Sequence, residues 1–130
     1  MAKAIKLKNN VYLSTDSIGI DLWHGNTNQT ITLNDNIYNY KYIEILWHDE
    51  NWRDGGIKKV WIGRNKVEYP ITLNTIRNDN TNLVIKNNEY TLKNNQLIVD
   101  SSRTVTISSN GAITTNTNNV IYLGNVIGYK

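Results

Sequence analysis

Apolar residues recur at every second position in short segments of this chain, and clusters of Asn, Asp and Gly separate these segments. Alternation with a period of two is typical of strands that bury one face, and Asn, Asp and Gly are typical of turns. No segment of ten or more residues has the apolar period of an amphipathic helix, and at most Asp35–Tyr40 forms one helical turn. The pattern predicts strands near 4–13, 19–23, 29–33, 41–48, 57–62, 66–73, 82–86, 89–93, 96–99, 103–108, 111–115 and 119–127.

Three dipeptides between these segments predict tight hairpins. Asn110-Gly111 predicts a type I′ turn, because both residues tolerate a positive φ. Asn87-Asn88 and Asn94-Asn95 predict two further hairpins, which would make a meander from about residue 82 to residue 99.

The length of 130 residues is sufficient for one domain. About a dozen closely spaced strands predict an all-β protein with a single antiparallel β-barrel or β-sandwich domain over residues 1–130. Within it, residues 1–20 would form a short neck or linker strand. The chain has no cysteine, which excludes disulfides, thiol nucleophiles and thiolate metal sites.

The charge is mild and is spread along the chain. The formal net charge is +3, and no basic run is longer than Lys58-Lys59, so a nucleic-acid partner is not favoured. A single-strand binder of the OB type, with tryptophans stacking on bases, remains an alternative that the modest charge disfavours. No apolar run approaches the roughly 20 residues that cross a bilayer, and no signal peptide is evident at the start, so we expect no membrane insertion.

No catalytic motif is recognisable. The two histidines lack metal-ligand spacing, the serines lack a nucleophile motif, and most of the eleven carboxylates fall in turns. Asp49, Asn51 and Asp54 are only faintly similar to a calcium loop, because Arg53 occupies a ligand position and the closing glutamate is absent. We therefore expect no enzyme activity, no cofactor and no metal.

The densest group of polar and aromatic residues lies between the strands predicted at 41–48 and 57–62. In an antiparallel pair with His48 opposite Ile57, the core face carries Ile43, Ile45, Trp47, Val60 and Ile62. The outer face then carries Glu44, Leu46, His48, Ile57, Lys59 and Trp61. The connecting loop adds Asp49, Glu50, Trp52, Arg53 and Asp54.

Such a group suits saccharide recognition. An indole can cover the apolar face of a sugar ring, while carboxylate, imidazole and guanidinium groups bind its hydroxyls. An exposed tryptophan in a loop is also frequent in protein interfaces. Alternatively, Trp52 folds back over the end of the domain and the loop charges are merely solvated.

Two stretches together resemble a known family. They are Asp21–Asn26 with Thr30–Asn34 and Ile37–Ile45, and the terminal Ile121–Lys130, which ends in Ile-Gly-Tyr-Lys. They are similar to the tip, or head, domain of tail fibres and receptor-binding proteins of bacteriophages of low-GC Gram-positive bacteria, the lactococcal siphophages among them.

The resemblance implies a trimeric β domain at the distal end of the phage tail in the virion, which binds a host cell-wall saccharide and contacts other phage tail proteins. It implies saccharide contacts from residues of matching type: His48, Asp49 or Glu50, Trp52 or Trp61, and Arg53 or Arg64. The hypothesis is thus a non-enzymatic, homotrimeric receptor-binding tip. The alternatives are a structural tail or baseplate subunit without glycan binding, and a bacterial lectin-like carbohydrate-binding module.

Overall fold

Strands dominate the residues that this computed structural model describes, which are 4–6, 12–14 and 18–130. One 3₁₀ turn, η3 (Ile37–Asn39), lies within the segment predicted to form a helical turn. In these residues there is no helix with the length and hydropathy needed to cross a membrane. The strands are β1 (Ala4–Lys6), β2 (Tyr12–Ser14), β3 (Ile20–Thr27), β4 (Ile31–Thr32), β5 (Tyr42–Asp49), β6 (Gly55–Trp61), β7 (Tyr69–Asp79), β8 (Asn82–Lys93), β9 (Gln96–Ile107), β10 (Ile113–Asn116) and β11 (Ile121–Tyr129).

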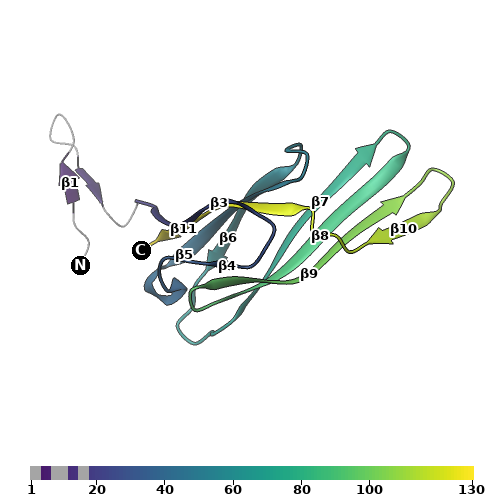
Figure 1. The fold of residues 1–130 in the computed structure, drawn as a ribbon. Coiled ribbons are helices and arrows are strands. Elements are labelled where there is room, and N and C mark those ends of the chain that lie inside the picture. The colour runs from purple at the N-terminus through teal and green to yellow at the C-terminus, as the bar shows by residue number, and fades with distance from the viewer. Residues whose placement is uncertain (1–3, 7–11, 15–17) are drawn as a thin grey trace.

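Two antiparallel sheets form the body of the fold (Figure 1). One sheet has the order β3-β11-β5-β6, and the other has the order β10-β9-β8-β7 with β4 paired to β9. A single apolar cluster joins them, with Ile43, Ile45 and Val126 from the first sheet and Leu73 and Tyr90 from the second. Both sheets are open at their edge strands and do not close into a barrel, so of the two predicted architectures the sandwich-like one agrees with the structure.

The sheet of β7 to β10 carries long hairpins whose burial fades toward their tips. Along β7 the inward residues Ile71, Leu73 and Thr75 are buried, whereas Arg77 is half-buried and Asp79 is exposed. The inward face therefore becomes polar where the opposite sheet no longer covers it.

The hairpin predicted at Asn87-Asn88 is wrong, because both residues lie within the continuous strand β8. Asn88 pairs with Leu73 on one side and with Ser102 on the other, so its backbone is extended. The chain turns instead at Asn80 and Asn94, which have φ values of 54° and 53°. The turn predicted at Asn94-Asn95 is thus confirmed.

Three further predictions, two of strands and one of a turn type, differ from the structure. The strands predicted at 96–99 and 103–108 are one strand, β9, and the break in the apolar pattern marks a register shift between Glu89 and Tyr90 of β8. The Asn110-Gly111 hairpin is present, but only Gly111 has a positive φ, so the type I′ turn is wrong. The strand predicted at 4–13 is wrong as one element, since Ala4 pairs with Ser14; residues 7–11 lie outside the described ranges.

The predicted faces of β5 and β6 are confirmed with a shifted register. His48 pairs with Gly55 and Leu46 pairs with Ile57, so the two strands slide by two residues relative to the expectation. A shift of two keeps every side chain on its face. Ile43 and Ile45 are buried accordingly, and Trp61 points outward.

Candidate ligand-binding face

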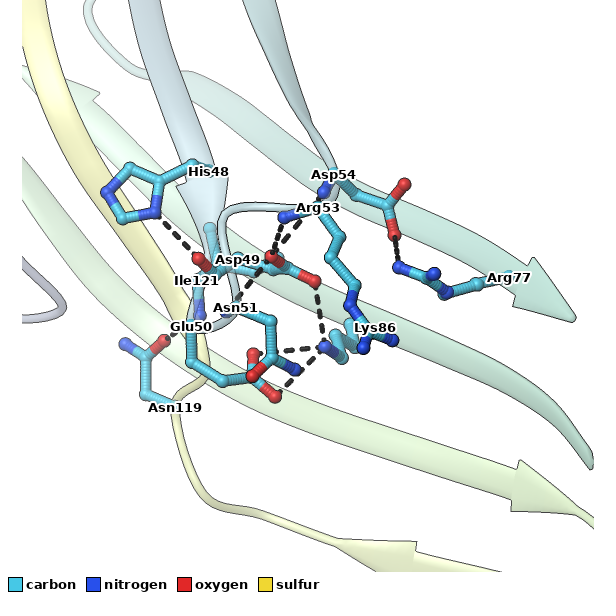
Figure 2. A network of polar contacts seen from close by, with 10 residues as sticks. All are labelled: His48, Asp49, Glu50, Asn51, Arg53, Asp54, Arg77, Lys86, Asn119 and Ile121. Atoms are coloured by element: carbon cyan, nitrogen blue, oxygen red, sulfur yellow. Dashed lines mark hydrogen bonds and ion pairs between the residues drawn. The ribbon is translucent and has the colours of Figure 1, made fainter. Parts of the chain in front are cut away.

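The loop between β5 and β6 is organised by the carboxylate of Asp49, which is 0% exposed (Figure 2). Its Oδ1 accepts hydrogen bonds from the backbone N–H groups of Asn51 (3.2 Å), Arg53 (3.0 Å) and Asp54 (3.4 Å). Its Oδ2 accepts from Nζ of Lys86 at 3.0 Å. Both oxygens are therefore used inside the protein.

Lys86 reaches the loop from the inner face of β8. Its Nζ also lies 3.0 Å from each carboxylate oxygen of Glu50. Burial alone would lower the pKa of Lys86, but its hydrogen bonds to Glu50 and Asp49 outweigh burial and raise the pKa. Burial would likewise raise the pKa of Asp49, yet the bonds from Lys86, Arg53 and Asp54 hold it below its usual value. This network ties one sheet of the sandwich to the other.

A stack of three rings lies on the outer side of the same loop. The His48 imidazole is parallel to the Trp52 indole, with centroids 3.4 Å apart, and to the Tyr122 ring, with centroids 5.6 Å apart. Nδ1 of His48 donates to the Asp49 carbonyl (2.6 Å), and Nε2 lies 2.8 Å from the side-chain amide oxygen of Asn26. The imidazole is thus fixed, and Trp52 covers it.

Trp52 has an unusual backbone for a large side chain, with φ at 57°. This left-handed region costs an L-residue other than glycine roughly 1–2 kcal/mol. The N–H of Trp52 donates to the carbonyl of Asp49 at 3.1 Å, which closes the turn. The indole is nevertheless 70% exposed, so the strain does not serve burial of the ring in the core.

A second aromatic cluster lies at the other end of β5. Tyr42 stacks on Tyr129 with centroids 4.6 Å apart, and the ring of Trp61 is tilted against Tyr42 at 4.9 Å. Nζ of Lys59 lies 4.0 Å from the centroid of Tyr42 and 4.5 Å from that of Trp61. Trp61 remains 60% exposed in this cluster.

The candidate residues thus fall into three settings. His48 is buried beneath the exposed indole of Trp52, and Trp61 belongs to a second aromatic cluster that is exposed. Asp49 is buried with both oxygens used inside the protein, so it is not available to a ligand, whereas Glu50 bonds Lys86 but keeps about a third of its side chain exposed. Arg53 is exposed in the loop, and Arg64 lines a cavity of about 600 Å³ after β6.

The two aromatic clusters share the outer face but do not form one compact site. Trp61 lies opposite Tyr42 at the start of β5, and Trp52 lies against His48 near the end of β5. Tyr42 and His48 are six residues apart along the strand. At about 3.3 Å per residue, the clusters lie on the order of 20 Å apart along the strand.

Two groups of residues were missed at the sequence level. The first is the internal position of Asp49: side chains alternate along a strand, so the inward positions Ile43, Ile45 and Trp47 are followed by an inward position at residue 49. Its partner Lys86 shares no local signal with it, because the two residues are 37 positions apart. The rings of Tyr122 and Tyr129 join the clusters only through the pairing of β11 with β5.

Within residues 4–6, 12–14 and 18–130, no group of three or more His, Asp or Glu side chains is placed to hold a metal ion. No protein-family model, curated protein or solved structure matches this chain.

Proposed function

We propose that this chain is a non-enzymatic receptor-binding tip of a phage tail, which adheres to a host cell-wall saccharide through the outer face of β5 and β6. The observation that carries the proposal is that Trp52 and Trp61 are each more than half exposed and yet held in place on one face. Rigid, exposed indoles suit the apolar C–H faces of sugar rings, because little side-chain entropy is lost on binding. The resemblance of the strand and terminal segments to phage tip domains supports the setting.

The spacing of the two clusters favours an extended saccharide over a single sugar. A chain lying along β5 would meet the Trp52 ring at one end and the Trp61 ring at the other. Between them lie Ile57, which is exposed, and Lys59 opposite Glu44, whose ammonium and carboxylate groups can bind hydroxyls. Arg53, exposed beside Trp52, adds a planar donor.

Avidity would strengthen such a shallow face. With only two exposed indoles on an open surface, a single domain binds weakly, because the interaction must also offset the loss of translational and rotational freedom. A homotrimer displayed at the distal end of the tail, in several copies, would multiply the affinity by orders of magnitude without new contacts.

The test is binding of the purified chain to a glycan array and to whole host cells, with Trp61→Ala and Trp52→Ala as variants. Each is expected to weaken binding about tenfold. Thr72→Ala is the control, because Thr72 is exposed on β7 of the other sheet, away from both aromatic clusters. Undiminished binding by both folded tryptophan variants would remove this face as the site, and no binding by the native chain would overturn the proposed function.

A bacterial lectin-like module would use the same face and differ only in which cells it recognises.

A second candidate function is a structural tail or baseplate subunit, and one observation favours it. The outer face of the long hairpins carries an apolar patch, the hairpin patch, formed by Ile76, Leu83, Ile85, Val105, Ile107 and Ile113. Ile76 and Ile113 are 69% and 68% exposed. Exposed apolar patches are typical of protein contacts, so this surface suits a neighbouring subunit. Measured self-association without any glycan binding would favour this function over adhesion.

A further inference from the structure

Two adjoining hollows lie along the loop that follows β6. One, of about 440 Å³, lies between β6 and the start of β7 and includes Trp61 in its wall. The other, of about 600 Å³, lies between the same loop and the segment of Tyr38 to Lys41. Ile62, Gly63 and Lys66 line both, so the two hollows adjoin, and together they are called the edge groove.

The walls of the edge groove are basic. Lys58, Lys59 and Lys66 line the first hollow, and Lys41, Arg64 and Lys66 line the second, whereas no Asp or Glu lines either. In the part of the chain that the structure describes, none of these five cations lies within ion-pair distance of a carboxylate.

The nearby acids are occupied or outside the walls. Glu68 pairs with Lys93 at 2.9 Å. Asp35 accepts from the Tyr40 hydroxyl at 2.8 Å. Glu44 lies on the neighbouring strand, opposite Lys59 in the ladder. The groove therefore concentrates five of the fourteen lysines and arginines of a chain whose net charge is only +3.

The loop that carries Arg64 and Lys66 is fixed at both ends. The Tyr69 hydroxyl accepts from the N–H of Gly63 at 2.7 Å and donates to the Gly63 carbonyl at 3.0 Å. The Tyr38 hydroxyl donates to the carbonyl of Val67. Nζ of Lys66 lies 5.2 Å from the centroid of the Tyr69 ring, which also lines the groove. Like charges held together in this way repel one another, and an anionic ligand relieves that repulsion.

We infer that the edge groove binds the anionic substituents of a polysaccharide, namely phosphate, sulfate or carboxylate groups carried along the sugar chain. The inference rests on the proposed function and specifies its ligand as acidic. Trp61 belongs both to the outer face of β5 and β6, which we call the aromatic face, and to the wall of the groove. A polysaccharide bound along this face therefore brings its substituents close to the cations of the groove. Ammonium and guanidinium groups donate charge-assisted hydrogen bonds to such oxyanions, and Arg64 can do so with two parallel bonds.

The test compares polymers that differ only in charge. Binding of the full chain to unmodified dextran, dextran sulfate, phosphorylated dextran and carboxymethyl dextran of equal length is measured at low and high salt. At least one anionic dextran is expected to bind more tightly than dextran, and the preferred oxyanion identifies the substituent. Lys66→Gln and Arg64→Gln are each expected to weaken that binding about fivefold and to reduce its salt dependence.

Arg103→Gln is the matched control, because it removes the same charge from an exposed position on β9, outside the groove. Equal losses for Lys66→Gln and Arg103→Gln would mean diffuse attraction and would overturn the inference, as would equal binding of charged and neutral dextrans. Tighter binding of oligothymidylate than of any dextran would overturn it in favour of nucleic acid. If Trp61→Ala abolishes glycan binding while Lys66→Gln leaves it intact, the edge groove fails and the proposed function stands.

Discussion

At the scale of single residues, the backbone conformations of Trp52 and Trp61 predict opposite effects of glycine and alanine on stability. Its φ of 57° favours glycine, whereas Trp61 lies in extended strand β6. Trp52→Gly should therefore be more stable than Trp52→Ala by about 1 kcal/mol in urea-induced unfolding. At Trp61 the order should reverse, with Ala more stable than Gly by about 0.5–1 kcal/mol. The same order at both positions would contradict the assigned backbone.

The buried ion pair of Asp49 and Lys86 should dominate the stability of the loop. Asp49→Asn leaves the Lys86 ammonium with Glu50 alone, and breaking a buried pair costs about 3–5 kcal/mol. Glu50→Gln should cost less than about 1 kcal/mol, because the Glu50 side chain is one-third exposed and its charge is screened. Unfolding in urea at neutral pH measures both, and similar losses would show that Glu50 contributes as much as Asp49 and would contradict the dominant role of the buried pair.

The same pair predicts how stability depends on pH. The folded-state pKa of Asp49 is below its unfolded value of about 3.9, so its contribution is complete above that pH and is lost as the pH falls through the folded pKa. The folded-state pKa of Lys86 is raised, so its contribution is complete below about pH 10.4 and is lost as the pH rises through the folded pKa. Unfolding measured across the acid range should therefore be steeper in pH for the native chain than for Asp49→Asn.

At the scale of elements, β11 shows where a strand needs glycine. A Cβ on Gly128 would lie 2.5 Å from Cδ1 of the buried Tyr40 ring, whereas a Cβ on Gly124 would approach only the Leu46 carbonyl oxygen at 3.5 Å. Gly128→Ala should thus cost about 1–3 kcal/mol through overpacking. Gly124→Ala should change the free energy of unfolding by less than about 1 kcal/mol, in either direction. Thermal unfolding of the two variants distinguishes them, and equal stabilities would mean that Tyr40 moves aside.

Local pattern was sufficient for the all-β class and for the faces of β5 and β6, because alternation depends only on which side is buried. It was insufficient for turns, since asparagine occurs both in left-handed corners, as at Asn80 and Asn94, and within strands, as at Asn88. The buried amide of Asn88 donates to Asn119 at 2.6 Å, which is a partner from the segment before β11. Residue type alone cannot distinguish these uses, because the partner is distant in sequence.

The candidate site was predictable to a similar degree. The outward position of Trp61 followed from the period of β5 and β6, and the exposure of Trp52 agrees with its place in a loop. The internal use of Asp49 required knowledge that β8 crosses beneath the loop and delivers Lys86. The edge groove required the fold of the loop after β6, which brings Arg64 and Lys66 beside lysines of an adjacent strand.

At the scale of the whole molecule, the aromatic face and the hairpin patch belong to different sheets. Trp61 lies on the sheet of β5 and β6, whereas Ile76 and Ile113 lie on that of β7 to β10. A ligand on the first surface leaves the second surface available to further copies of this chain. Adhesion and assembly can therefore be separated by mutation.

We expect the native chain to form a homotrimer that uses the hairpin patch. Ile76→Thr combined with Ile113→Thr keeps strand propensity and removes apolar surface, so the variant should sediment with a lower mass than the native chain. Ile57→Thr, at a similarly exposed position on the other sheet, is the control and should leave the mass unchanged. Binding of a short monovalent saccharide by the double variant should equal that of the native chain, while binding to a multivalent glycan surface should fall by about tenfold or more. A native chain that sediments as a monomer at the concentration tested, or a double variant that keeps its full mass, would remove the hairpin patch as the contact between copies.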